Sequence, residues 1–66
     1  MAYINQESEA IAQANGWTYE SGYNQGFNMA YAGEADNNYF PKFSQAWHGH
    51  KAGYKDGKKA WKRGYR

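Results

Sequence analysis

The amino-acid sequence predicts an all-α fold, a hairpin of two helices that pack through stripes of glycine and alanine. Three observations support this prediction. Small residues recur at helical spacing over residues 44–65, a related motif lies 31 residues earlier, and a proline-containing segment separates the two. The chain has 66 residues and no Cys, which allows one small domain, 1–66, and excludes disulfides. Because chains this short often complete their core with a partner, we also expect a homodimer or another bound partner.

The first helix is expected over residues 5–33, with a break near Asn15–Gly16. Glu7 and Glu9 near its start suit the positive end of a helix dipole. A competing prediction places a β-hairpin at residues 17–31, within an α+β fold. Most aromatic side chains there stand at every second position, which is the alternation of a strand.

The second helix is expected over residues 44–65, after a connecting loop at 34–43. Ser44 follows Pro41 and is a favourable N-cap. At about 100° per residue, this segment has one face of Gly and Ala, a neighbouring aromatic face and a Lys/Arg face. It is therefore an amphipathic helix with three distinct sides.

Glycine is the residue that the two helices share at matching positions, since Gly22–Gly26 and Gly53–Gly57 are both Gly-Tyr-x-x-Gly. Glycine costs ~1 kcal/mol per helix position relative to Ala. Interior glycines are therefore favourable only where another backbone approaches closely. We expect these glycines to pack the helices together: Gly22, Gly26, Gly33, Gly49, Gly53, Gly57 and Gly64.

Charge divides the chain into two halves. Residues 1–41 carry −5 and contain no Lys or Arg, whereas residues 42–66 carry +7, and the formal net charge is +2. A basic segment of this kind indicates an anionic partner, unless the acidic half folds against it and neutralises it. Lysine and arginine neutralise phosphates, and interleaved aromatic rings stack on unpaired bases. The predicted RNA-binding residues are Lys51, Lys55, Lys58, Lys59, Lys62, Arg63, Arg66, Trp61 and Tyr65.

Catalytic and metal-binding patterns are absent from the sequence, so we expect no enzyme activity, no cofactor and no metal. His48 and His50 stand two residues apart, which places them on different faces of a helix, and we expect both at the surface. No apolar run approaches the ~18–20 residues that span a bilayer. No basic region of a signal peptide is present either, so we expect no membrane contact and a cytoplasmic location.

Residues 17–66 resemble the ribosome modulation factor family of very small bacterial proteins, and similar short proteins are common in phage genomes. The resemblance lies in Gly22–Gly26, in the linker with Asn38 and Pro41, and in Ala60–Tyr65, an Ala-Trp-x-x-Gly-aromatic motif. It implies two helices joined by a linker, binding to ribosomal RNA on the small subunit, and silencing of translation by ribosome dimerisation.

Position by position, the resemblance implies that Lys62 and Arg63 face RNA. It implies packing roles for Gly22, Tyr23, Gly26, Trp61 and Gly64. Two functions follow from the sequence as a whole. The favoured one is a non-enzymatic RNA- or ribosome-binding regulator of translation that uses the basic helix. The alternative is a phage-type inhibitor or adaptor that binds a host protein through the acidic, Tyr-rich N-terminal half.

Overall fold

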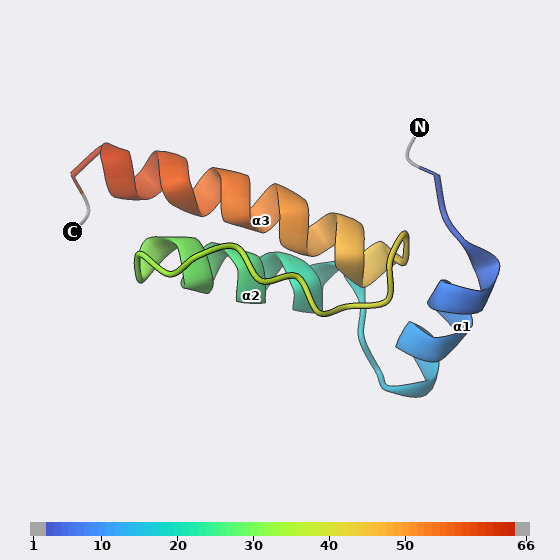
Figure 1. The fold of residues 1–66 in the computed structure, drawn as a ribbon. Helices are drawn as coiled ribbons and strands as arrows, with labels where there is room; N and C mark the ends of the chain where they lie inside the picture. Colours follow the sequence, from blue (N-terminus) through green and yellow to red (C-terminus); the bar gives the residue numbers. More distant parts are fainter. Residues whose placement is uncertain (1–2, 65–66) are drawn as a thin grey trace.

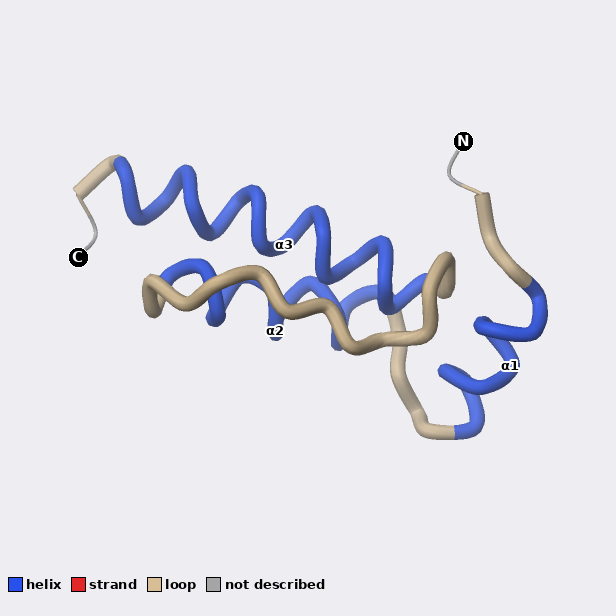
Figure 2. The backbone as a smooth tube through the Cα atoms, viewed as in Figure 1, coloured by secondary structure: helices blue, strands red, loops and turns tan. Residues whose placement is uncertain are grey.

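The protein consists of three helices in a computed structural model that describes residues 3–64: α1 (Gln6–Ala14), α2 (Tyr19–Tyr31) and α3 (Gln45–Lys62) (Figures 1 and 2). No strand occurs among these residues, so the all-α prediction is confirmed. The alternative β-hairpin at 17–31 is wrong. Its aromatic residues at 19, 23, 27 and 31 also recur every four residues, which is helical spacing, and this period is the one that the chain adopts.

The first helix expected over 5–33 is in fact two helices, α1 and α2. Asn5 caps α1, since its Oδ1 accepts a hydrogen bond of 3.0 Å from the Ser8 amide. Gly16 then has a φ of +73°, a conformation that favours glycine, and the chain changes direction there (Figure 1). Thr18 caps α2 through a 3.1 Å bond from the Ser21 amide. The expected break at Asn15–Gly16 is therefore a complete turn between two separately capped helices.

Helices α2 and α3 lie side by side and run in the same direction. The connection at 32–44 returns along the pair before α3 begins, as Figure 2 shows. Ser44 caps α3 as the sequence predicts, accepting a bond of 3.1 Å from the Trp47 amide. Helix α1 lies near the start of this pair. There Glu9 Oε1 accepts a hydrogen bond of 2.8 Å from the amide of Gln45, the first residue of α3.

Five glycines form the seam between α2 and α3. A Cβ built on Gly22 or Gly26 would lie 1.9 Å from the Ala46 carbonyl oxygen or 2.2 Å from that of His50. From the other side, a Cβ on Gly49, Gly53 or Gly57 would lie 2.1, 2.0 or 2.6 Å from the carbonyl oxygen of Tyr19, Tyr23 or Phe27. The helices therefore meet backbone to backbone, which only residues without a side chain permit.

Gly33 and Gly64 do not belong to this seam, and the expectation that they pack the helices is wrong. Each stands two residues after its helix ends, with φ of +78° and +95° respectively. Nothing lies within 4 Å of a Cβ built on either one. Their period continues the seam in sequence, but their backbone has the left-handed conformation that ends helices.

The connection covers one side of the helix pair. Phe40 is only 5% exposed, and its ring lies 5.4 Å from that of Trp17 and 6.0 Å from that of His50. Asn38 Nδ2 donates a 3.0 Å bond to the Trp47 carbonyl, and the Tyr54 hydroxyl donates a 2.7 Å bond to the Glu34 carbonyl. These contacts fix the connection along its length.

His50 lies beneath this connection, fully buried, so its expected surface position is wrong. Its Nε2 lies 3.0 Å from Asp36 Oδ1, while its Nδ1 has no hydrogen-bond partner. The ring also stacks on Tyr54, with 6.4 Å between the ring centroids. His48, two residues earlier, is half-buried and its Nε2 lies 2.6 Å from the Tyr3 carbonyl oxygen.

Candidate nucleic-acid interface

Four aromatic residues along α2 form a continuous stack, which we call the aromatic ladder: Tyr19, Tyr23, Phe27 and Tyr31. Successive ring centroids lie 6.5, 6.3 and 6.2 Å apart, and the planes differ by only 24°, 25° and 14°. Tyr19 and Tyr31 at its ends are 45% and 40% exposed, and the two middle rings are half-buried. The four-residue spacing produces the stack, since residues i and i+4 are neighbours on a helix.

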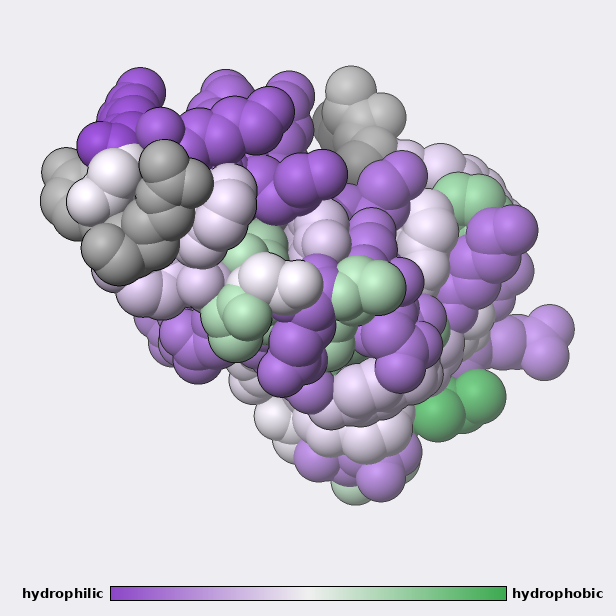
Figure 3. Space-filling model, turned by 60° about the vertical axis from the view of Figure 1, so that its left-hand side comes forward, coloured by the Kyte–Doolittle hydropathy of each residue, from purple (hydrophilic) through white to green (hydrophobic). Residues whose placement is uncertain are grey.

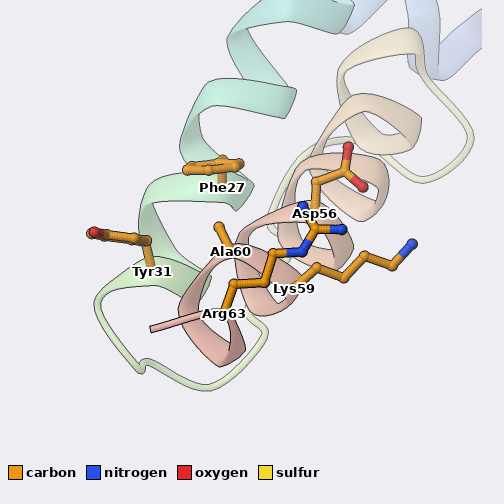
Figure 4. A pocket seen from close by; sticks show the side chains of 6 residues that line it. All are labelled: Phe27, Tyr31, Asp56, Lys59, Ala60 and Arg63. Atoms are coloured by element: carbon orange, nitrogen blue, oxygen red, sulfur yellow. The ribbon is translucent and has the colours of Figure 1, made fainter. Parts of the chain in front are cut away.

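Four cations on α3 form a second series with the same spacing, which we call the basic row: Lys51, Lys55, Lys59 and Arg63. All four are exposed. Two depressions bring the ladder and the row together. One has a volume of about 680 Å³, and its lining includes Phe27, Tyr31, Lys59 and Arg63 (Figure 4). The other includes Tyr19, Lys51 and Lys55.

We call the surface between the ladder and the row the groove. Figure 4 shows Phe27 and Tyr31 on α2, Arg63 of α3 extending toward Asp56, and Lys59 of α3 extending away from the two rings. The part of the connection that covers the pair, residues 34–40, lines neither depression. The groove is therefore an open side of the helix pair with one aromatic wall and one basic wall.

Asp56 is the carboxylate that lines the groove. It accepts a short hydrogen bond from the Tyr23 hydroxyl. This bond raises the pKa of Tyr23, and burial and the negative charge of Asp56 add to the effect. The contact joins the ladder to α3 near the middle of the groove.

Lys58, Lys62 and Trp61, which were also predicted to bind RNA, line a different depression. It lies against Ala30 and the start of the connection, including Glu34. Trp61 is 38% exposed there. Figure 3 shows strongly hydrophilic side chains gathered along the outer edge of the molecule over α3. Tyr65 and Arg66 lie outside the described residues.

The basic surface is not neutralised by the acidic half. Within residues 3–64, the ion pair joins Asp36 to His50, and no Lys or Arg has a carboxylate oxygen within 4.0 Å. Two Lys side chains instead lie over aromatic rings, Lys51 at 4.8 Å from Trp47 and Lys58 at 5.7 Å from Tyr54. Positive charge therefore remains available to an anionic partner.

Sequence reasoning did not include the aromatic ladder in the site. The spacing at 19, 23, 27 and 31 was visible, but a side-chain stack on the first helix has no link in sequence to cations on the second.

No group of three or more His, Asp or Glu residues that could hold a metal ion occurs in the described part of the chain. None of the three described helices is long and apolar enough to span a membrane. Comparison with family models, curated proteins and solved structures finds no match.

Proposed function

We propose that this protein is a non-enzymatic, RNA-binding regulator of translation that binds ribosomal RNA of the small subunit through the basic surface of α3. One observation carries the proposal. The six described cations of that surface are exposed, and no carboxylate pairs with any of them: Lys51, Lys55, Lys58, Lys59, Lys62 and Arg63. An unpaired row of this kind attracts phosphates and releases their counterions on binding.

The use of the acidic residues supports this proposal over the alternative inhibitor. Glu9 binds the first amide of α3 and Asp36 binds the buried His50, so both contribute to the fold. The remaining acids of the N-terminal half, Glu7, Glu20 and Glu34, are exposed and carry half of the chain's six carboxylates. Two of the five acids of the N-terminal half therefore already have partners within the fold, whereas no carboxylate pairs with any of the six described cations.

Salt dependence measures the electrostatic part of such binding. Each neutralised phosphate of a single strand contributes about −0.7 to the slope of log affinity against log salt. Engagement of all six cations would give a slope of about −4. We expect affinity for isolated small ribosomal subunits to fall steeply between about 50 and 200 mM salt.

Lys55→Glu tests which surface binds. This residue lies in the basic row. Reversing its charge is expected to lower the affinity for small subunits, measured by co-sedimentation, about tenfold or more. Lys42→Glu is the matched control, because Lys42 is an exposed Lys in the connection before α3. If both variants bind like the parent protein, or if Glu20→Gln weakens binding instead, the basic surface is not the binding surface.

A further inference from the structure

The aromatic ladder and the basic row share one register. The carbonyls of Tyr19, Tyr23 and Phe27 face Gly49, Gly53 and Gly57 across the seam, a constant offset of 30 residues. In each case the cation of the basic row stands two residues after that glycine. Because the helices are parallel and each rises 1.5 Å per residue, both series advance by about 6 Å per step.

This step suits single-stranded nucleic acid. Stacked bases are about 3.4 Å apart, so two stacking distances are about 6.8 Å. The spacing of the ladder rings in the structure, 6.2–6.5 Å, is close to this value. A base therefore enters between two rings after a small rotation of their side chains, and the cation of the same step lies on the α3 side, where it can meet the phosphate.

We infer that the groove holds a single-stranded RNA segment with one nucleotide per step, its bases stacked on the aromatic ladder and its phosphates along the basic row. This inference rests on the proposed function and adds the class of RNA and its orientation across the two helices. Duplex RNA does not fit, because its bases are already stacked on one another and are not available to side-chain rings. The recognition is tolerant of sequence, since every base has an aromatic face.

Among the described residues that line the groove, Asp56 is the one acidic residue, and its carboxylate repels an anion. Its charge is set against the four cations of the basic row. Its oxygen is engaged by the Tyr23 hydroxyl, which holds one rung of the ladder in place. The groove thus keeps an excess of positive charge while Tyr23 is held by Asp56, so the neighbouring rings are the ones that rotate to admit a base.

Fluorescence anisotropy with labelled oligouridines of two, four and eight nucleotides, and with an eight-base-pair RNA duplex, tests this inference. Affinity is expected to rise steeply up to four nucleotides, three in the intervals between the four rings and one stacked on an end ring. The eight-nucleotide strand is expected to bind about tenfold more tightly than the duplex. Equal affinity for the duplex would overturn the inference.

Two ladder variants separate stacking from charge. Phe27→Leu is expected to weaken single-strand binding about tenfold while leaving the weak duplex binding unchanged, because it removes a ring but no charge. Tyr19→Leu is the second variant, at a more exposed position where the fold is less affected. Tyr39→Leu is the matched control, since Tyr39 is 56% exposed and lies in the connection.

The outcomes distinguish the inference from the proposed function. If Phe27→Leu and Tyr19→Leu bind single strands like the parent protein while Lys55→Glu does not, the ladder has no part in binding and the basic surface still does. If Lys55→Glu also binds like the parent protein, the proposed function fails as well. Circular dichroism of each variant shows that the helices persist.

Discussion

The two sides of the α2·α3 pair differ in what lies over them. On one side the connection packs Phe40 into the core and bonds to α3 through Asn38 and Asp36. On the other side the aromatic ladder and the basic row border a groove that the covering part of the connection does not reach. One helix pair therefore has a side that contributes to stability and a side that remains accessible. This division supports the proposed binding surface.

The glycine seam explains why aromatic side chains occupy both sides. A helix pair usually interdigitates Leu, Ile or Val side chains, but this chain has no Leu or Val. Its backbones meet directly, so no large side chain fits between them. Rings at the neighbouring positions lie beside the seam instead, where Tyr54 meets the connection and Tyr23 and Phe27 border the groove.

Breaking the glycine seam is expected to cause the largest loss of stability, because both sides of the α2·α3 pair depend on it. A Cβ on Gly53 would lie 2.0 Å from the Tyr23 carbonyl oxygen and 2.7 Å from its carbon, both backbone atoms that cannot move aside. Gly53→Ala is therefore expected to remove most of the ~3–5 kcal/mol that a domain of this size has. Circular dichroism melts measure the loss.

Lys55→Ala is the control for the seam, since it changes an exposed position of the same helix and introduces a better helix former. It is expected to melt at or slightly above the temperature of the parent protein. A Gly53→Ala protein with an unchanged, cooperative melt would contradict the backbone contact between α2 and α3.

Disrupting the side of the α2·α3 pair that the connection covers is expected to cause the next largest loss of stability. His50→Ala removes a fully buried ring that contacts Phe40 and Tyr54, together with its bond to Asp36. We expect a cost of about 2–3 kcal/mol in urea unfolding, from the cavity and the lost bond. Hydrogen exchange is expected to rise mainly in residues 34–43.

His48→Ala is the matched control, because the His48 side chain is half-buried and its ring nitrogen lies within hydrogen-bond distance of the Tyr3 carbonyl oxygen. Its expected cost is below about 1 kcal/mol. Equal costs for the two histidine variants would mean that the connection does not bury His50 in solution.

Removing a helix cap is expected to cause a smaller loss of stability, and the loss is expected to differ between the caps of α3 and α2. Ser44 is fully buried where α1 meets α3, whereas Thr18, the cap of α2, is exposed. Ser44→Ala is expected to cost about 1–2 kcal/mol, because water cannot replace the lost acceptor of the Trp47 amide. Thr18→Ala is expected to cost about 0.5–1 kcal/mol. Thermal melts that rank the two variants in the opposite order would show that the start of α3 is open to water.

The sequence predicts the parts of this fold that depend on local spacing. Small residues at intervals of three and four place the seam on both helices, and Ser44 after Pro41 marks the start of α3. The direction of the helices is not local. A connection of 32–44 can turn back sharply or run the length of a helix, and only its contacts with α3, such as Asn38 to Trp47, fix the second arrangement.

The same limit applies to the site. The basic row was found from the sequence, but the ladder lies on another helix and is brought beside it by the seam. His48 and His50 are the same residue type and stand two positions apart on one helix, so the sequence gives no reason to expect different burial. Their different burial follows from the path of the connection, which places Asp36 beside His50. Long-range packing of this kind has no periodic signal.

The smallest expected effect concerns the Tyr23–Asp56 bond, the contact that joins the two walls of the groove. Because this bond raises the pKa of Tyr23, its contribution to stability is present below the usual tyrosine value of about 10 and is lost as pH rises through the higher value of the folded protein. We expect the parent protein to exceed Tyr23→Phe in melting temperature at about pH 8, by an amount that shrinks above pH ~10. Asp56→Asn removes the carboxylate that causes the shift, so its difference from the double variant with Tyr23→Phe is expected to change less over this range. A gap between parent and Tyr23→Phe that stays constant to about pH 11 would mean that the hydroxyl does not donate to Asp56, and that the ladder meets α3 through its rings alone.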